Sequence, residues 1–285
     1  MSTERPRRLL LTGASGLVGA EVHAELSRSA QVTCANDRTQ GDLSRGGLPE
    51  GPFDTVVHVA AHLPHDLTGP DGDAAAQENT AMDGRVLDLV QAKGAHLVYF
   101  STASVFARAP VLRDDSAVAP DIAYAKAKLH TEELIAARKL SACIFRLVAP
   151  YGARQQRHTV LRKFVLDGLA GKPLRYYGTG ARTQDFIHVR DVAAAVRAAV
   201  DQRAQGTFVL ASGRSVTMRE LAGLVSAATG GRSVIESAGV DDPEEGVQVR
   251  YDIHGLARGL GFTPQTSLEA GVAEWAAALR AQEAP

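Results

Sequence analysis

The glycine-rich turn near the start of the chain restricts the fold more than any other sequence feature. It reads Thr12-Gly-Ala-Ser-Gly-Leu-Val-Gly19 and lies between a short apolar run and a helical pattern. In such a unit Gly13 permits a tight turn, Gly16 lets backbone NH groups approach a pyrophosphate, and Gly19 lets the helix pack closely on the strand. The start of the helix adds partial positive charge for the phosphates. The turn therefore predicts a dinucleotide-binding unit.

Short apolar runs alternate with helical patterns through the first half of the chain. The expected strands cover residues 8–11, 31–35, 55–60, 96–100 and 142–148, and the expected helices cover 17–28, 74–93 and 122–139. This order is typical of parallel strands joined by helices that cover both faces of a sheet. The predicted fold class is α/β, a doubly wound parallel sheet of the Rossmann type.

The regular alternation weakens after residue 152. Two turn clusters, Gly171-Lys-Pro173 and Tyr177-Gly-Thr-Gly180, indicate a smaller C-terminal lobe that covers the substrate. Trp275 is expected to anchor the last helix of this lobe in its core. The expected dinucleotide-binding domain is 1–152, with 186–211 returning to it, and the expected substrate-binding lobe is 153–185 and 212–285.

The charge balance argues against several classes of partner. The formal net charge is -1, so the chain has no strong field to hold nucleic acid or a membrane surface. The apolar run at residues 9–11 is too short for a signal peptide or a membrane span, and the expected location is the cytoplasm. Cys34 and Cys143 lie in expected strands without metal-ligand spacing, so we expect no metal site.

The residues after the second expected strand bear on the choice between NAD and NADP. Asp37 follows the glycine turn at about the twenty-residue distance at which an acidic side chain holds the adenosine ribose, which favours NAD. Arg38 is its neighbour, and a guanidinium there could pair with the 2′-phosphate of NADP. Asp42 and Leu43 could bracket the edge and face of the adenine. The cofactor is expected to be NAD or NADP, with NAD favoured.

Tyr124 and Lys128 lie one helical turn apart in an expected helix. Residues at this spacing share one face, so the Lys128 ammonium can lie near the Tyr124 phenol and favour its ionised form. An unperturbed phenol has a pKa of about 10 and is a poor base at neutral pH, and a nearby positive charge is the simplest correction. The pair therefore predicts hydride transfer assisted by a tyrosine.

Further motifs follow the glycine turn in order. They are Gly41-Asp-Leu43, Val57-His-Val-Ala-Ala61, Asn79, Ser101-Thr-Ala-Ser-Val-Phe106, Tyr124 to Lys128, Arg146-Leu-Val-Ala-Pro-Tyr-Gly152, Gly180 to Asp191, Leu260-Gly-Phe-Thr-Pro264 and Ser267-Leu-Glu269. Together they resemble the extended short-chain dehydrogenase/reductase family, in its NAD-dependent epimerase/dehydratase branch that modifies nucleotide sugars. The resemblance covers nearly the whole chain.

The resemblance implies a catalytic set of Thr102, Tyr124 and Lys128. Thr102 would hydrogen-bond the substrate oxygen, with Ser101 and Ser104 as rivals for that role. Tyr124 would donate its proton as hydride arrives, while Lys128 steadies the tyrosinate and binds the nicotinamide ribose. The positions implied for the cofactor are Gly13, Ser15, Gly16, Leu17, Val18, Gly19, Asp37, Arg38, Asp42, Leu43, Ala60, Ala61, Asn79, Tyr124, Lys128 and Leu147. Those implied for the substrate are Thr102, Ser104, Tyr124, Ala149, Arg182 and Gln184.

Departures from the family pattern narrow the expected chemistry. Family dehydratases carry an acidic pair directly after the catalytic threonine, where this chain has Ala103 and Ser104. Members acting on nucleotide sugars often have Asn where Ala149 stands and Arg where Gln184 stands, which leaves other substrates open. The nearest arginine, Arg182, could still reach a diphosphate. His58 is expected to pack or hydrogen-bond at a strand end rather than to catalyse.

The resulting expectation is an NAD(P)-dependent oxidoreductase that reduces a keto group, at C4 of a nucleotide-linked deoxysugar. One alternative is a C4 epimerase of the same fold that holds NAD tightly. Another is a non-catalytic dinucleotide-binding sensor or scaffold, since a fold alone does not fix a function. By resemblance, the helices at 74–93 and 122–139 would pair two copies of the chain into a homodimer.

Overall fold

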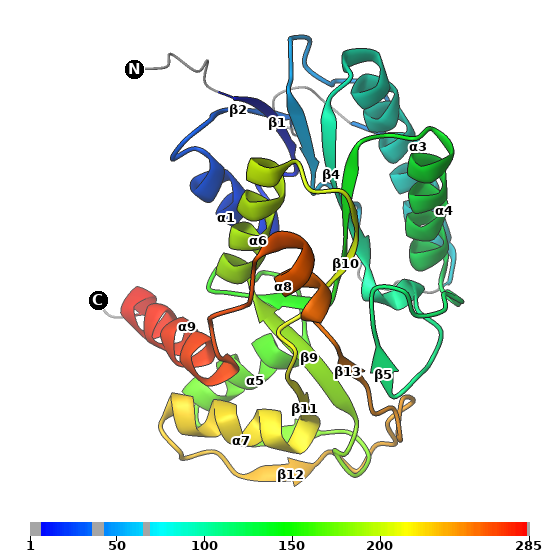
Figure 1. Ribbon diagram of the computed structural model, residues 1–285. Coiled ribbons are helices and arrows are strands. Elements are labelled where there is room, and N and C mark those ends of the chain that lie inside the picture. Colours follow the sequence, from blue (N-terminus) through cyan, green and yellow to red (C-terminus); the bar gives the residue numbers. More distant parts are fainter. Residues whose placement is uncertain (1–6, 36–42, 65–68, 284–285) are drawn as a thin grey trace.

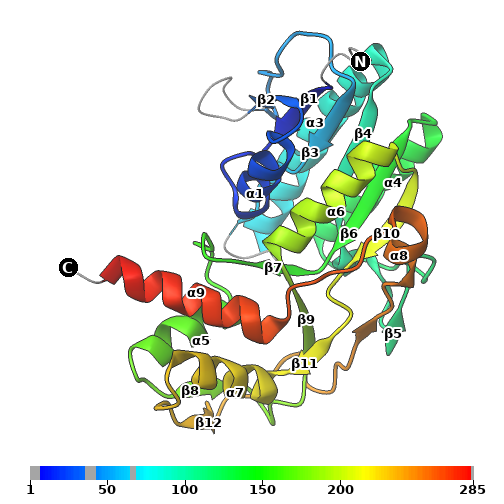
Figure 2. The same ribbon diagram turned by 60° about the vertical axis from the view of Figure 1, so that its left-hand side comes forward.

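A six-stranded parallel sheet forms the centre of the molecule. In the computed structural model the described residues are 7–35, 43–64 and 69–283. The strand order is β2-β1-β3-β4-β6-β10, and every pair is parallel (Figures 1 and 2). The strands are β1 (Arg8–Thr12), β2 (Gln31–Ala35), β3 (Thr55–His58), β4 (His96–Thr102), β6 (Ala142–Leu147) and β10 (Gly206–Leu210). The predicted α/β class and doubly wound sheet are confirmed.

Helices cover both faces of this sheet because its strands carry apolar side chains on both sides. Leu9 and Leu11 of β1 pack into one apolar cluster, while the intervening Leu10 packs into the other, as the alternation of a strand requires. The first face is covered by α1 (Leu17–Leu26), α6 (Val189–Gln202) and α8 (His254–Leu260), and the second by α3 (Gly69–Lys93) and α4 (Ala123–Ala137).

The strand order reverses beside β1, which places the glycine turn at the switch point of the sheet. From β1 the chain moves outward to β2 and then returns across β1 to β3 on its other side. A Cβ atom on Gly13, whose φ is 73°, would lie 2.7 Å from the backbone nitrogen of Ala60 in the segment after β3. Only glycine allows this approach, and ligands of open α/β sheets bind at such a point.

A smaller lobe lies beyond the C-terminal ends of the strands (Figure 2). Its three-stranded sheet contains β7 (Ala149–Tyr151), β9 (Thr183–His188) and β11 (Ser215–Thr217), and β8 (Leu174–Tyr176) pairs with β12 (Ile235–Ser237). Its helices are α5 (Val160–Leu169), α7 (Met218–Thr229) and α9 (Leu268–Glu283). Trp275 is 2% exposed in the core between them, which confirms its predicted role as an anchor.

The lobe differs from its expected boundaries at both ends. Strand β7 lies before residue 152 but pairs with β9 of the lobe. Residues 186–188 were expected to return to the dinucleotide-binding domain, but they belong to β9. Helix α8 lies within 212–285, yet its Leu256 and Leu260 pack into the core of the main sheet. A separate two-stranded sheet pairs β5 (Val111–Leu112), from the dinucleotide-binding domain, with β13 (Arg250–Tyr251), from the C-terminal part of the chain. Strands of two or three residues and a seven-residue helix are too short to show a period in the sequence.

Helix α3 is 25 residues long, which is enough to cross a bilayer. Its sequence includes Asp71, Asp83, Arg85 and Lys93, so it lacks the apolar character of a span. None of the other helices in the described ranges combines sufficient length with sufficient apolar character either.

We expect Gly19→Ala to distort the glycine turn. The added Cβ atom would lie 2.0 Å from the Gly13 carbonyl oxygen, which is backbone and cannot move aside. The expected cost is about 1–3 kcal/mol of unfolding free energy, together with weakened dinucleotide binding. Urea denaturation and titration of NADH fluorescence measure the two effects.

Gly84→Ala is the matched control, because its Cβ meets nothing within 4 Å on helix α3. It should stabilise the protein by roughly 0.5–1 kcal/mol and leave dinucleotide binding unchanged. Equal effects from the two variants would contradict the packing argument.

Candidate active site

The first turn of α1 is open to an anion. Its N-cap residue Gly16 is exposed and has no side chain to accept hydrogen bonds from the first amides of the helix. Ser15 is also exposed, Leu17 is half-buried, and Val18 and Gly19 are buried between helix and strand. Uncapped amides with a helix dipole behind them suit a phosphate group. The predicted positions therefore have the chemistry that a dinucleotide pyrophosphate requires.

A cavity of about 490 Å³ lies between this turn and the smaller lobe. The turn contributes Ser15, Gly16 and Leu17 to its wall. The lobe contributes Arg154, which follows β7, and Arg162 of α5. Two guanidinium groups beside a helix N-terminus make this wall favourable for phosphates. Neither arginine was identified from the sequence, because neither belongs to a recognisable motif.

Three of the residues expected to choose between NAD and NADP, namely Asp37, Arg38 and Asp42, lie outside the described residues. Leu43 is described and is 2% exposed in the apolar cluster on the α3 and α4 face. The preference for NAD therefore stays a prediction from the sequence.

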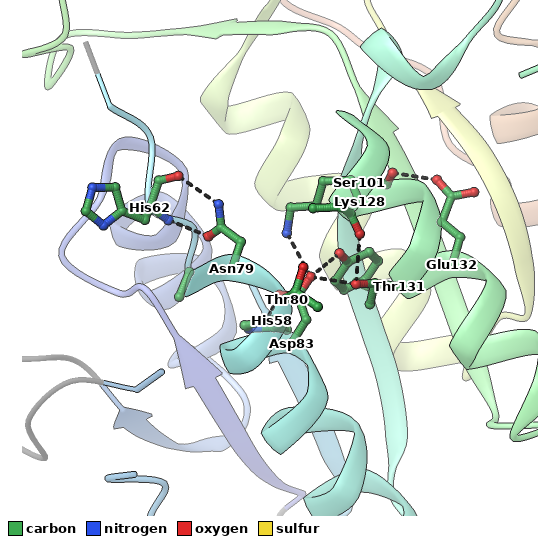
Figure 3. Close-up of polar contacts among 12 residues, drawn as sticks. His58, His62, Asn79, Thr80, Asp83, Ser101, Lys128, Thr131 and Glu132 are labelled. Atoms are coloured by element: carbon green, nitrogen blue, oxygen red, sulfur yellow. Dashed lines mark hydrogen bonds and ion pairs between the residues drawn. The ribbon is translucent and has the colours of Figure 1, made fainter. Parts of the chain in front are cut away.

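Lys128 is buried, and its ammonium contacts an acid that sequence reasoning missed. The Lys128 side chain is 2% exposed, with Nζ 3.4 Å from Asp83 Oδ2 and 4.7 Å from the centroid of the Tyr99 ring (Figure 3). Asp83 belongs to α3 and Lys128 to α4, so their ion pair joins the two helices that cover one face of the sheet. Tyr99 belongs to β4 of that sheet. A buried ion pair of this kind is costly unless further hydrogen bonds complete it.

Asp83 has those further hydrogen bonds. Its Oδ1 lies 2.8 Å from His58 Nε2, and its Oδ2 accepts from the Tyr99 hydroxyl at 2.5 Å and from the Thr131 hydroxyl at 2.9 Å (Figure 3). Burial opposes ionisation, but the charge of Lys128 and the hydrogen bonds from His58 and Tyr99 hold the pKa of Asp83 below its usual range. The carboxylate is therefore charged at neutral pH.

His58 connects Asp83 to the glycine turn. Its Nδ1 lies 2.6 Å from the hydroxyl of Thr12, and the same hydroxyl accepts from the Ala60 backbone nitrogen at 3.2 Å. A neutral imidazole with its proton on Nε2 satisfies all of these contacts, because Thr12 then donates to Nδ1 and Nε2 donates to Asp83. His58 is therefore a hydrogen-bonding residue at a strand end, as predicted.

Tyr124 is half-buried in the first turn of α4, one turn before Lys128. Burial raises its pKa above the ordinary value, the negative charge of Asp83 raises it further, and the guanidinium of Arg157 opposes them. The expectation that Lys128 favours the ionised phenol stays a prediction from the sequence.

Thr102 and Ser104 lie where β4 ends. The Thr102 hydroxyl accepts from the Ser104 backbone nitrogen at 3.2 Å and caps the short helix η1 (Ala103–Val105). Thr102 is half-buried and Ser104 is exposed. The third hydroxyl, on Ser101, is bound to Glu132 at 2.5 Å, and Glu132 in turn pairs with Arg146 at 2.7 Å. Ser101 is thus committed to a buried ion pair, which leaves Thr102 and Ser104 for a substrate.

Asn79 fixes the segment after β3 that contains Ala60 and Ala61. Its side chain is buried, accepts from the backbone nitrogen of His62 at 2.7 Å and donates to the carbonyl of His62 at 2.9 Å (Figure 3). The amide is used by this backbone, and the predicted contact of Asn79 with a cofactor stays a prediction. Leu147, at the end of β6, is half-buried beside Thr102 in the register of the sheet.

The expected substrate residues of the lobe lie on neighbouring strands. Ala149 opens β7, and Gln184 lies in β9, its partner strand. Arg182 pairs instead with two acids, with Nε 2.8 Å from Asp242 Oδ2 and NH1 3.1 Å from Glu244 Oε2. Two carboxylates neutralise this guanidinium, so its attraction for a diphosphate is weaker than its position in the motif implies.

Arg157 spans the two parts of the molecule near Tyr124. Its NH1 donates to the Leu63 carbonyl at 3.0 Å and its NH2 to the Pro64 carbonyl at 2.8 Å. It lies after β7 in a stretch without a motif, so no sequence signal identified it. Asp83 did have a signal: it falls on the buried stripe of α3 that also contains Asn79, Met82 and Val86, where a charged residue requires a partner.

Comparisons with known proteins agree with this geometry. A model of the NAD dependent epimerase/dehydratase family matches residues 9–211. Methionine adenosyltransferase 2 subunit beta from Pongo abelii is 27% identical over 76% of this chain and 70% of its own length. A dTDP-glucose 4,6-dehydratase from Streptomyces niveus is 26% identical over 94% of this chain and 91% of its own length.

A solved structure has the same architecture throughout. MoeE5 in complex with UDP-glucuronic acid and NAD superposes with a TM-score of 0.86 at 25% identity, covering 96% of this chain and 99% of MoeE5. The family model, the relatives and the dinucleotide turn agree with the motifs that the sequence carries. The chain belongs to the NAD-dependent epimerase/dehydratase family of extended short-chain dehydrogenases/reductases, and its cofactor is a nicotinamide dinucleotide.

Proposed function

We propose that this protein is a ketoreductase that reduces the C4 keto group of a nucleotide-linked deoxysugar. One observation carries the proposal: Thr102 ends β4, and Tyr124 and Lys128 lie one turn apart in α4, so the hydroxyl, phenol and ammonium that a ketone reduction uses are all present. A simple ketone reduction needs no further acid or base. The absence of acids at Ala103 and Ser104 argues against the dehydration that other family members perform.

The chemistry requires one proton and one hydride. The bound dinucleotide supplies the hydride to the carbonyl carbon. Tyr124 gives its proton to the carbonyl oxygen, which becomes the hydroxyl of the product, and Thr102 donates a hydrogen bond to the same oxygen. Lys128 would hold the nicotinamide ribose and would stabilise the phenolate until a proton from solvent restores the phenol.

Support for a nucleotide sugar comes from the relatives and from the cavity. The dTDP-glucose 4,6-dehydratase is named for a nucleotide sugar, the structure of MoeE5 contains UDP-glucuronic acid, and the match to each covers nearly the whole of this chain. Arg154 and Arg162 in the wall of the cavity suit phosphate groups. Arg182 contributes only if it exchanges Asp242 or Glu244 for the diphosphate.

We expect the reductase to consume cofactor in proportion to product. With a 4-keto-6-deoxy nucleotide sugar and NADH or NADPH, each product molecule should match one oxidised cofactor, followed by absorbance at 340 nm and chromatography. Tyr124→Phe removes the proton donor and should lower kcat by roughly 10²–10⁴-fold. Product formed without net cofactor consumption would instead support the alternative, a C4 epimerase that holds NAD tightly.

The cofactor itself should be NAD rather than NADP. Asp37 favours the free ribose hydroxyl of NAD, and removing it should weaken that preference. The measurement is the ratio of kcat/KM for NADH to that for NADPH in the wild type and in Asp37→Ala, with Arg38→Ala as the companion variant. A ratio that favours NADPH in the wild type and is reversed by Arg38→Ala would assign NADP.

A non-catalytic role remains the second candidate because one relative is named as a subunit of a methionine adenosyltransferase. A sensor or scaffold would bind the dinucleotide and use neither the Tyr124 phenol nor the Thr102 hydroxyl. If Tyr124→Phe binds NADH normally and preserves the cellular function of the gene, the scaffold assignment replaces the reductase.

We also propose that two copies pair through α3 and α4. A shallow groove of about 670 Å³ runs between these helices, and small residues such as Ala76, Ala81 and Ala127 line it. Small side chains allow helices of two copies to approach closely.

The expected molar mass from light scattering is that of a dimer, and Ala81→Glu should reduce it to that of a monomer. Ala81 is exposed on α3, so the substitution is not expected to disturb the fold. Ala273→Glu changes an exposed alanine of α9 in the same way and should leave the dimer intact. A monomeric wild type at micromolar concentration would refute the pairing.

A further inference from the structure

The cavity between the glycine turn and the smaller lobe has two positive charges in its wall that no acid balances. They belong to Arg154, which is exposed, and to Arg162, whose Nε donates to the backbone carbonyl of Gln155 at 2.9 Å. None of the residues described in this wall is an aspartate or a glutamate. Neither arginine forms an ion pair with a described carboxylate, unlike Arg182, which is held by two acids. The cavity therefore attracts anions.

Gln155 adds an uncharged polar group to the same wall. It is 8% exposed, and its side-chain amide makes no hydrogen bond to another residue of the described ranges. An amide buried to this extent normally has a partner, because its desolvation is otherwise uncompensated. A phosphate oxygen in the cavity could accept a hydrogen bond from it.

The opposite wall of the cavity is the first turn of α1. Ser15, Gly16 and Leu17 contribute to it, and the N-cap Gly16 has no side chain to accept from the first amides of the helix. Helix α1 packs on the main sheet, whereas α5 and α9 pack in the core of the lobe (Figure 2). A phosphate ligand in the cavity would therefore receive hydrogen bonds from both regions of the molecule.

Apolar side chains complete the wall on the side of the lobe. They are Leu166 of α5 and Trp275 and Leu279 of α9. Apolar surroundings lower the local dielectric constant and so strengthen the attraction between a guanidinium and a phosphate. The volume of about 490 Å³ is typical of a small-molecule site, for which the usual range is about 300–1,000 Å³.

We propose that Arg154, Arg162 and Gln155 bind a diphosphate from the side of the lobe, opposite the amides of α1, so that the ligand joins the lobe to the main sheet. Each guanidinium can give two parallel hydrogen bonds to phosphate oxygens. The diphosphate can belong to the dinucleotide or to a nucleotide sugar, which share this chemistry. The glycine turn in the same cavity makes the dinucleotide the expected source. That source does not depend on the proposed reduction, whereas the nucleotide-sugar source rests on the proposed function.

Arg154→Gln is the first test, because Arg154 is exposed and its replacement should not disturb the fold. The measurements are the Kd of NADH by fluorescence and the Kd of dTDP by calorimetry, both without turnover. We expect NADH to bind about tenfold more weakly, since a hydrogen bond between charged groups is lost. Weaker binding of dTDP would assign the diphosphate to the nucleotide sugar. Unchanged Kd values for both ligands would overturn the inference.

Gln155→Glu tests the buried amide with little change in shape. The new carboxylate would repel a phosphate and compete with it for Arg162, so the ligand that depends on Arg154 should also bind more weakly to this variant. Tighter or unchanged binding in a folded variant would contradict a phosphate at this wall. If Gln155→Glu is not folded by circular dichroism, Arg154→Gln decides alone.

Arg232→Gln is the matched control. It removes an exposed arginine of the same lobe, between α7 and β12, outside the cavity wall. The net charge changes as in Arg154→Gln, but both Kd values should stay at those of the wild type. Equal weakening in the two variants would show that the overall charge rather than a contact is responsible, and would overturn the inference.

Hydrogen exchange tests whether the ligand contacts both walls. In the wild type, saturating NADH should slow amide exchange in residues 153–166 as well as in the first turn of α1. In Arg154→Gln at saturating NADH, the protection of α1 should remain and that of 153–166 should decrease. If dTDP is the ligand that depends on Arg154, the same comparison is made with dTDP. Protection confined to α1 in the wild type would overturn the inference.

The two proposals fail in different ways. If no keto sugar is reduced but NADH binding depends on Arg154, the proposed function falls and the diphosphate site stands. If reduction proceeds and neither NADH nor dTDP depends on Arg154, the proposed function stands and this inference falls.

Discussion

The ion pair between Asp83 and Lys128 is the interaction on which the arrangement of the site depends. Each charge would be costly to bury alone, and the hydrogen bonds from β3, β4 and α4 make the burial tolerable. Four elements are held together around one carboxylate, on the same face of the sheet where α3 and α4 pack. Removal of one partner would therefore leave a buried charge unpaired, which is far more destabilising than the loss of an exposed ion pair.

The parts of the molecule that repeat with a clear period could be predicted from the sequence. The strands of the main sheet and the helices between them were found within a few residues, because their apolar patterns extend over enough residues to distinguish a strand from a helix. The glycine turn was found because each glycine has a steric reason, confirmed by the 2.0 Å approach that a Cβ on Gly19 would make to Gly13. Strand β7 and helix α8 were assigned to the wrong region because pairing across the chain, not local pattern, decides where such short elements lie.

The catalytic helix shows where reasoning from spacing alone ends. Spacing placed Tyr124 and Lys128 on one face of α4, and the structure has them one turn apart in a single helix. Spacing could not reveal that an acid on another helix also contacts Lys128, since α3 and α4 are distant in the sequence. A buried stripe that contains an acid, as in α3, is the sequence signal that would have prompted a search for a cation.

The crossing made by Arg157 has a mechanical consequence. The Arg157 side chain ties the segment after β7 to the segment after β3 through two hydrogen bonds, to the backbone carbonyls of Leu63 and Pro64. Neither apolar core takes part in that tie, so the two segments can separate for roughly the free energy of two hydrogen bonds, about 1–3 kcal/mol. The tie can therefore open while the sheet and the lobe keep their internal packing.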